Sequence, residues 1–165
     1  MIKGYEIERK FLVEFPDIAD LNLKKKVEIY QTYLQNEDEE IQRRVRRITI
    51  DGLVTYTYTE KLFITPVTRR EMEYDIDKTE YERLIVQARD DCAPIEKIRY
   101  CFEYENQLFE LDTYPFSNDM AILELELSEP EQHISFPDNI KIIKEVTGDS
   151  CYANAAIATA GAFPE

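Results

Sequence analysis

The feature that most constrains the fold is a run of charged side chains at every second position near the N-terminus. Glu6, Glu8 and Lys10 alternate with Ile7 and Arg9. On a β-strand, side chains at this spacing share one face. Leaving such ions unpaired in a dry interior is costly, because desolvation is only partly repaid. This column of charges therefore faces either bulk water or a wet cavity.

The same alternation recurs along most of the chain. The acids in this pattern are Glu6, Glu8, Glu71, Glu73, Glu110, Asp112, Glu124 and Glu126, and the bases are Lys10, Arg44, Arg46, Lys61, Arg69, Lys97 and Arg99. Burying all of these ions in a dry core would cost more than the ~5–15 kcal/mol net stability of a domain. The pattern therefore predicts a closed sheet around a lumen that is wet or filled by ions.

The predicted strands are joined mostly by connections of hairpin length. The strands are expected at 5–14, 27–36, 41–50, 53–63, 68–77, 94–104, 107–114 and 120–128, with a further short strand or turn at 140–146. Asp51-Gly52 is a strong hairpin signal. Short antiparallel connections favour a barrel or a strongly curved sheet over a doubly wound fold. The expectation is an α+β fold with about eight antiparallel strands and flanking helices, as one domain over residues 1–165.

Two segments have the hydrophobic period of a helix. Residues 78–91 are expected to form an amphipathic helix with Thr79 as its N-cap, and residues 150–160 a second helix with Asp149 as its N-cap. A short helical turn is expected at 129–133, and a loop or single turn at 16–26.

Composition excludes several classes of function. The formal net charge is −14, and an acidic surface argues against nonspecific binding to nucleic acid or anionic membranes. No apolar run approaches the ~20 residues of a membrane helix, and no apolar leader follows Met1. Cys92, Cys101 and Cys151 show no CxxC spacing, and with His133 as the one histidine we expect neither a zinc site nor histidine chemistry. Free thiols indicate a reducing, cytoplasmic compartment.

Short motifs in a fixed order give these charges a family resemblance. E-I-E-R-K at 6–10 resembles the ExExK signature of the CYTH superfamily, the triphosphate tunnel metalloenzymes. Similar motifs follow in family order: Q-T-Y-L (31–34), R-V-R (44–46), T-E-K (59–61), R-x-E-x-E (69–73), E-K-I-R-Y (96–100), F-E-L-D (109–112), L-E-L-E (123–126) and V-T-G-D…Y-x-N (146–154). The resemblance spans the chain and is closest to the short bacterial members. It implies an eight-stranded β-tunnel that hydrolyses the terminal phosphate of a triphosphate with Mg²⁺ or Mn²⁺.

The resemblance also implies a role for each charged position. The metal carboxylates would be Glu6, Glu8, Glu124 and Glu126, with Glu110 and Asp112 as secondary ligands or as groups that orient metal-bound water. The triphosphate would be held by Lys10, Arg44, Arg46, Lys61, Arg69, Lys97 and Arg99. The expected catalytic set is Glu6, Glu8, Lys10 and Asp112. These residue types suit the roles, since carboxylates bind hard divalent cations and Arg and Lys bind phosphate oxygens.

One motif departs from the family pattern. Members often carry Lys or Arg around the terminal tyrosine, whereas here Tyr152 lies in the run Asp149–Ala155, which has no basic residue. This leaves phosphate affinity and substrate preference open, and Lys141 or Lys144 could compensate from nearby.

Several alternatives stay open. The same tunnel supports a class IV-type adenylate cyclase or a noncatalytic module that binds polyphosphate or a nucleotide, and a lumen can also be no more than a salt-bridge network. The substrate (inorganic triphosphate, thiamine triphosphate or a nucleotide), the metal and the oligomeric state are undecided, with a homodimer as one option.

Overall fold

The computed structural model describes residues 2–164. Its strands are β1 (Ile2–Glu14), β2 (Leu23–Leu34), β3 (Ile41–Ile50), β4 (Leu53–Phe63), β5 (Thr68–Ile76), β6 (Ile95–Tyr104), β7 (Gln107–Thr113), β8 (Met120–Leu127) and β9 (Ile142–Glu145). The helices are α1 (Lys78–Ile85) and α2 (Asn154–Ala160), with 3₁₀ turns η1 (Ile18–Asp20) and η2 (Ser150–Tyr152). Neither helix within this range is long and apolar enough to cross a membrane.

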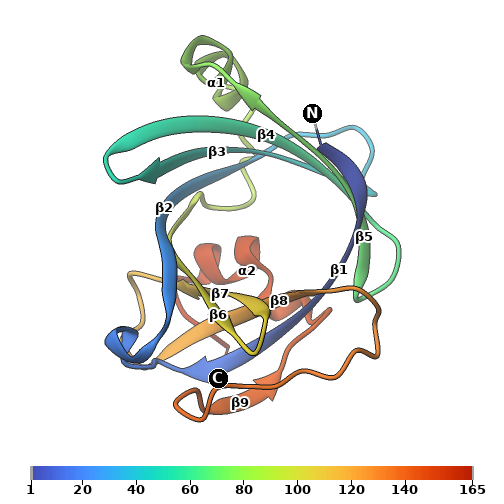
Figure 1. Ribbon diagram of the computed structural model, residues 1–165. Helices are drawn as coiled ribbons and strands as arrows, with labels where there is room; N and C mark the ends of the chain where they lie inside the picture. Colours follow the sequence, from blue (N-terminus) through green and yellow to red (C-terminus); the bar gives the residue numbers. More distant parts are fainter. Residues whose placement is uncertain (1, 165) are drawn as a thin grey trace.

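Eight antiparallel strands close into a barrel, as the sequence predicts. Their order is β5-β4-β3-β2-β6-β7-β8-β1, and β1 pairs with β5 to complete the ring. Figure 1 looks into this ring. The first half of β1 pairs with β5 and its second half with the short strand β9, from Phe11 opposite Glu145. The prediction of an α+β fold built on an eight-stranded antiparallel barrel is confirmed.

Tight turns fix the register of the predicted hairpins. Asp51 and Gly52 between β3 and β4 have φ of 50° and 81°, and Glu105 and Asn106 between β6 and β7 have φ of 51° and 59°. Two consecutive residues with positive φ are typical of the hairpin turn whose twist matches that of the strands. Each turn therefore keeps the alternation of charged and apolar faces in phase across its hairpin.

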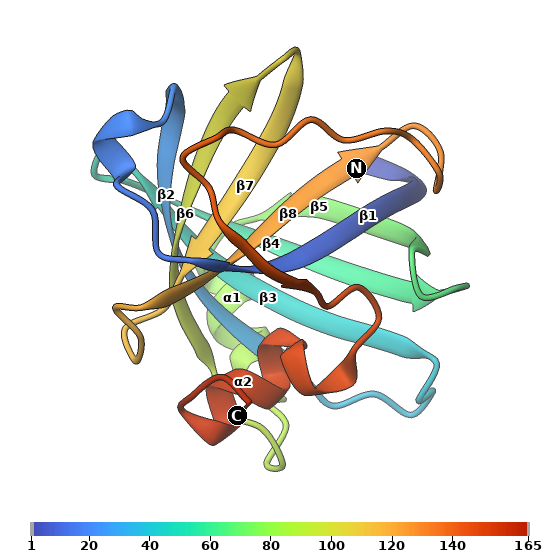
Figure 2. The same ribbon diagram turned by 90° about the horizontal axis from the view of Figure 1, so that it is seen from below.

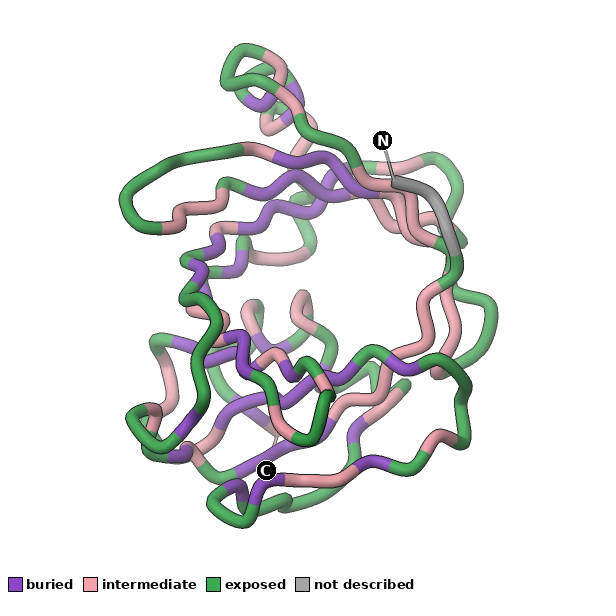
Figure 3. The backbone as a smooth tube through the Cα atoms, in the orientation of Figure 1, coloured by how far each residue is buried: buried purple, intermediate pink, exposed green. Residues whose placement is uncertain are grey.

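The apolar core lies mostly outside the barrel wall rather than in its centre. One cluster, around Phe109, Leu111 and Leu123, is covered by Ile134 and Ile140 of the long connection after β8. A second lies under α1, whose Tyr81 and Leu84 pack on β2, β3 and β4. In Figure 3, buried segments accordingly alternate with less buried ones around the ring. Because the helices and loops cover the outer face, the charged face is left to the lumen.

A third apolar cluster closes one end of the lumen. Leu12 is two residues after Lys10, and Tyr114 is two residues after Asp112, so both continue lumen-facing columns. They pack with Ile157 of α2 and with Phe163. Figure 2 shows α2 lying across this end of the barrel. The charged lumen therefore has an apolar floor.

Several predicted boundaries were wrong. The N-cap of α1 is Asp77, whose side chain accepts from the Glu80 amide, and not Thr79. This helix ends at Ile85 rather than near residue 91, because Ala88 forms a bridge with Leu34 at the end of β2.

Three other segments also differ from expectation. Strand β2 begins at Leu23, inside the predicted 16–26 loop. The predicted 150–160 helix is broken at Ala153, so Asp149 caps the 3₁₀ turn η2 instead of α2. Residues 129–133 form a turn without a helix.

Candidate functional site

The lumen of the barrel contains a cavity of about 760 Å³. All of the charged residues that the sequence places on the inner face line this cavity, except Lys97 and Asp112. The carboxylates come from β1, β5, β7 and β8, whereas the buried arginines Arg44 and Arg46 come from β3. A cavity with a charged wall is therefore present, and its acids and bases are unevenly distributed around that wall.

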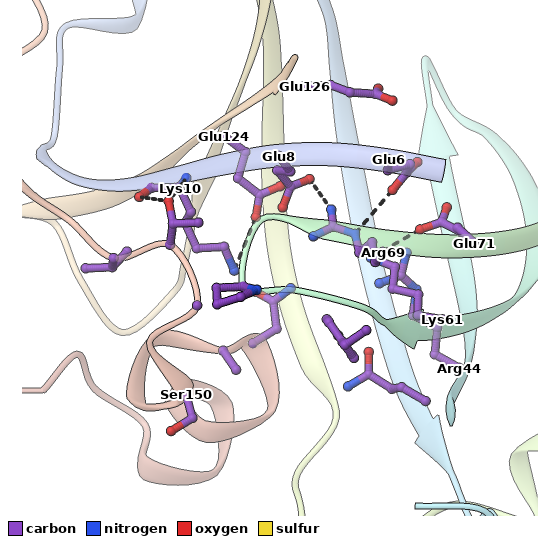
Figure 4. Close-up of a pocket in the computed structure, with 18 of the residues that line it drawn as sticks. Glu6, Glu8, Lys10, Arg44, Lys61, Arg69, Glu71, Glu124, Glu126 and Ser150 are labelled. Atoms are coloured by element: carbon purple, nitrogen blue, oxygen red, sulfur yellow. Dashed lines mark hydrogen bonds and ion pairs between the residues drawn. The ribbon is translucent and has the colours of Figure 1, made fainter. Parts of the chain in front are cut away.

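Arg69 is the centre of the carboxylate side. Its guanidinium forms ion pairs with both Glu8 and Glu6, and Nε lies 3.3 Å from Glu6 Oε2. Figure 4 shows Arg69 reaching from β5 between the two carboxylates of β1. This contact follows from register, since Glu6 is directly opposite Arg69 in the β1–β5 pair. One cation thus holds both acids of the ExExK motif.

A second ion pair lies next to the first. Lys61 Nζ is 3.3 Å from Glu71 Oε2. Burial and the neighbouring charge of Glu71 raise the pKa of Glu6 to about 7. Burial, Arg44 and Arg69 lower the pKa of Lys61 to about 7. Both shifts have the same physical origin, because burial penalises the charged form and a neighbouring like charge adds to that penalty.

Lys10 joins the N-terminal motif to the late strand β8. Its Nζ lies 3.5 Å from Glu124 Oε1, and the two residues are direct partners across β1 and β8. Burial opposes the ionisation of Glu124, but the charges of Lys10, Arg99 and Lys97 together outweigh it and lower the pKa of this carboxyl to about 2. The backbone amide of Lys10 donates to Thr147 Oγ1 at 2.9 Å, which fixes the segment after β9 beside the cavity.

The opposite wall presents donors without acceptors. Arg44 and Arg46 are 5% and 8% exposed. Arg46 Nε donates to Gln31 Oε1 at 2.5 Å, and Gln31 Nε2 donates to the Tyr33 hydroxyl at 2.8 Å. By contrast, Arg44 Nε and Thr57 Oγ1 are buried and have no hydrogen-bond partner among the described residues. Buried polar groups are normally paired, so these two atoms are exceptions on this wall.

Lys97 and Asp112 form a buried ion triad with Arg99 behind the cavity wall. Lys97 Nζ is 2.7 Å from Asp112 Oδ2, and Arg99 Nε is 2.7 Å from Asp112 Oδ1. The pair Lys97 and Asp112 has no exposed side-chain surface. Arg99 also reaches Glu110 at 2.9 Å and Glu124 at 3.5 Å, so it links the triad to the lumen.

The carboxylates of the lumen offer oxygen donors to a metal ion. Among residues 2–164, no three His, Cys, Asp or Glu side chains gather closely enough to hold an ion in this arrangement. Two pairs of carboxylates nonetheless face each other across strands, Glu8 with Glu126 and Glu110 with Glu124. Arg99 contacts both Glu110 and Glu124, and Arg69 contacts Glu8, so cationic side chains already lie against these acids. Their carboxylate oxygens are of the donor type that suits a hard divalent ion. The donor set therefore fits such a cation.

Some lining residues were not singled out from the sequence. Gln42 lines the cavity, and Gln31 accepts a hydrogen bond from Arg46. Tyr33 was expected only to pack, but it both lines the cavity and belongs to the apolar floor. The signal was available for Gln31 and Tyr33, because they alternate on β2 and pair with Arg46 and Arg44. Neutral residues such as these do not stand out in a pattern defined by charged residues.

The segment after β9 lacks the basic groups that were considered for it. Lys144 Nζ lies 4.9 Å from the centre of the Tyr152 ring, and Lys141 pairs with Glu14 at 3.9 Å. Neither lysine belongs to the described cavity lining, which takes Val146 to Ser150, Ala153 and Asn154 from this part of the chain. Compensation by these lysines is therefore not supported.

Comparison with known proteins agrees with this geometry. Over 154 residues the chain is 34% identical to the inorganic triphosphatase of Acetivibrio thermocellus, covering 92% of each chain. A solved structure of an inorganic triphosphatase has 32% identity and a TM-score of 0.59, covering 93% of this chain and 94% of that chain. A Hippeastrum adenylyl cyclase candidate with a dominant triphosphatase activity shares the fold at 14% identity and a TM-score of 0.50, covering 76% and 81%. Residues 4–146 match the CYTH domain. The resemblance found in the sequence motifs is thus confirmed, and the chain belongs to the CYTH domain family.

Proposed function

We propose that the protein hydrolyses the terminal phosphoryl group of a triphosphate bound in the barrel lumen, with the help of a divalent cation. The observation that carries this proposal is the buried guanidinium of Arg44, whose Nε has no partner among the described residues. A buried cationic donor without an acceptor is costly unless a ligand supplies the acceptor. A phosphate chain would supply several, and the inorganic triphosphatases at 32% and 34% identity support this choice of ligand.

The phosphate chain would lie between Arg44, Arg46 and Lys61 on one wall and Arg69, Arg99 and Lys10 on the other. Phosphoryl transfer requires little covalent chemistry from the protein, so positioning and charge neutralisation dominate. Lys97 and Asp112 would not contact the phosphates themselves and would hold the Arg99 guanidinium in place. This assigns them a positioning role within the set predicted from the sequence.

Glu6, Glu8, Glu124 and Glu126 would hold the divalent cation, Mg²⁺ or Mn²⁺, with Glu110 beside them. When bound, the ion neutralises phosphate oxygens and lowers the pKa of a bound water. Arg69 connects the two sites, because its guanidinium pairs with both Glu6 and Glu8. A phosphate chain that attracts Arg69 would release these carboxylates, so anion and cation should each favour binding of the other.

A substitution of one proposed ligand tests this function. Glu8→Gln should lower metal-dependent phosphate release by at least about a hundredfold, the range found when one electrostatic group is removed from an active site. Glu103→Gln is the matched control, since Glu103 pairs with Lys24 at the surface, with both side chains about half exposed. Near-UV circular dichroism of both variants checks the fold.

The same assay separates the alternatives. Wild-type rates in Glu8→Gln would overturn the metal assignment. Cyclic AMP and pyrophosphate from ATP would indicate a cyclase, and tight triphosphate binding without turnover at any Mg²⁺ or Mn²⁺ concentration would indicate a noncatalytic module.

A further inference from the structure

Arg46 is held in the barrel by an uncharged side chain. Its guanidinium is buried, and Nε donates to Gln31 Oε1 at 2.5 Å. Gln31 is 0% exposed and is the direct partner of Arg46 across β2 and β3. Directly opposite residues in an antiparallel pair project to the same side of the sheet, so both side chains face the lumen. The contact is therefore fixed by strand register.

The orientation of the Gln31 amide is determined by its two neighbours. An arginine side chain only donates hydrogen bonds, so Gln31 must present its oxygen to Arg46. Its Nε2 then faces the Tyr33 hydroxyl and donates to it at 2.8 Å. Rotation of the amide would break a hydrogen bond in a buried site, which is costly. Gln31 is thus a rigid support for the Nε edge of the Arg46 guanidinium.

Arg46 differs from most cations of the cavity in what compensates its charge. Apart from Arg44, the other cations of the lining each form an ion pair with a carboxylate: Lys10, Lys61, Arg69 and Arg99. Between residues 2 and 164, Arg46 forms no such pair, and the acceptor for its Nε is a neutral amide. Burial and the charges of Arg44 and Arg99 lower the pKa of Arg46. The guanidinium is therefore held in place without a counter-ion.

A neutral acceptor suits a cation that has to bind an anion. A carboxylate at position 31 would orient Arg46 equally well, but it would compete with an anionic ligand for the same charge. An apolar side chain would leave the charge available, but Arg44 and Arg99 would then repel a guanidinium with no fixed position. The glutamine amide avoids both problems.

We propose that Gln31 is a positioning residue for triphosphate binding, which orients the Arg46 guanidinium and leaves its charge to the bound phosphates. This inference rests on the proposed function and adds a residue to it. Gln31 has no exposed surface and is not among the described lining residues of the cavity. It therefore acts through Arg46 and does not touch the substrate.

Two substitutions separate the orientation of Arg46 from its charge. Gln31→Met keeps the length of the side chain and removes both hydrogen bonds. Gln31→Glu keeps an acceptor for Arg46, and the Tyr33 hydroxyl can donate to the new carboxylate, but the substitution adds a counter-charge. Titration calorimetry with inorganic triphosphate in EDTA measures the affinity of each variant, and urea unfolding measures its stability.

The two measurements should rank the variants in opposite orders. Gln31→Met should weaken triphosphate binding by about tenfold, the lower end for loss of a hydrogen bond to a charged group. Gln31→Glu should weaken it by about a hundredfold, because the carboxylate cancels the charge of Arg46. Gln31→Glu should nevertheless be the more stable variant, since its carboxylate pairs with Arg46. A merely structural role would make affinity follow stability.

Matched controls come from a second glutamine–arginine contact. Gln87 Oε1 accepts from Arg43 Nη1 at 3.2 Å, and neither residue is among the described lining of the lumen cavity. Gln87→Met and Gln87→Glu should leave triphosphate binding within about twofold. A double-mutant cycle tests the route: in an Arg46→Met background, Gln31→Met should lower the affinity by less than about a further twofold.

The outcomes separate this inference from the proposed function. Affinities that follow stability, or an effect of Gln31→Met that persists in full without Arg46, overturn the role of Gln31 and leave the proposed function intact. A wild-type protein that neither binds nor hydrolyses triphosphate overturns the proposed function and the inference with it. If Gln31→Met does not fold, Gln31→Glu decides alone, since an affinity equal to that of Gln87→Glu overturns the inference.

Discussion

Lys97 Nζ lies 2.7 Å from Asp112 Oδ2, and neither side chain has any surface exposed to solvent. Arg99 binds the same carboxylate through Nε and Nη2, at 2.7 Å and 2.9 Å. One carboxylate therefore pairs with two cations inside the barrel. Removing one member of such a buried set leaves charge without compensation.

Asp112→Asn is expected to destabilise the protein by about 3–5 kcal/mol, since Lys97 and Arg99 lose their shared counter-ion. Urea unfolding followed by circular dichroism measures the change. Glu103→Gln removes an exposed ion pair of the sort that contributes about 0–1 kcal/mol, and serves as the control. Equal free energies of unfolding for the two variants would contradict a stabilising role of the triad.

The same carboxyl predicts a pH dependence of stability. Burial opposes its ionisation, but Arg99 and Lys97 outweigh burial and hold the pKa of Asp112 well below its usual value of about 3.9. As the pH falls, the unfolded chain therefore takes up a proton at this carboxyl first. Its stabilisation is present above about pH 4 and is lost as the pH falls below that value.

The difference in unfolding free energy between wild type and Asp112→Asn should accordingly shrink from neutral pH to about pH 3. Denaturant titrations at several pH values measure this difference, and comparing two chains that share every other carboxyl removes the background of acid unfolding. A difference that stays constant over this range would show that Asp112 is not held ionised by its neighbours.

Lys61 predicts uptake of protons when triphosphate binds. Burial, Arg44 and Arg69 lower its pKa to about 7, so a fraction of Lys61 is neutral slightly above neutral pH. A bound polyanion stabilises the charged form and raises this pKa. Titration calorimetry in EDTA, with two buffers of different ionisation enthalpy, should show proton uptake that is reduced in Lys61→Met.

Some uptake should persist in Lys61→Met, because the pKa of Glu6 is about 7 and a nearby anion raises it further. Adding Glu6→Gln should remove this second contribution. Uptake that is the same in the wild type and both variants would mean that other groups take up the proton.

Alternation along single strands predicted the face on which each charge lies, and the hairpin-length connections and the family motifs predicted the barrel. Glu6 and Arg69, far apart in the chain, both belong to that face and meet in the structure. Alternation fixes the face of a strand but not the depth along the barrel axis. Lys97 and Asp112 therefore could not be distinguished from the charges that line the cavity. The apolar floor that covers this end of the lumen includes α2 and Phe163, which come from a distant part of the chain.

The errors in helix boundaries have a similar cause. Ala88 continues the helical period of Tyr81, Leu84 and Ile85, yet the chain leaves the helix after Ile85. The segment after the helix pairs with the end of β2 instead. Ala88 forms a bridge with Leu34, and the Arg89 amide donates to the Tyr33 carbonyl oxygen at 2.9 Å. Such long-range partners leave no local signal in the sequence.

Gly148 lies against Pro66, where the segment 146–150 meets the turn 63–66. Its φ is 72°, and an added Cβ would come within 2.7 Å of Pro66 Cβ and 3.4 Å of Pro66 Cα. Gly161, after α2, has a similar φ of 68° but nothing within 4 Å of an added Cβ. Each Gly→Ala change therefore costs the left-handed backbone penalty of about 1–2 kcal/mol, and only Gly148→Ala adds a clash.

Gly148→Ala should lower the melting temperature more than Gly161→Ala does. It should also raise KM for triphosphate, because the segment 146–150, which lines the cavity, must move away from the turn 63–66. Pro66→Gly in the same chain removes the clashing atom and should recover the part of the loss that is specific to position 148, which a double-mutant cycle measures. Equal losses at the two glycines, with no recovery by Pro66→Gly, would mean that backbone strain alone decides the outcome and that the two segments do not hold each other in place.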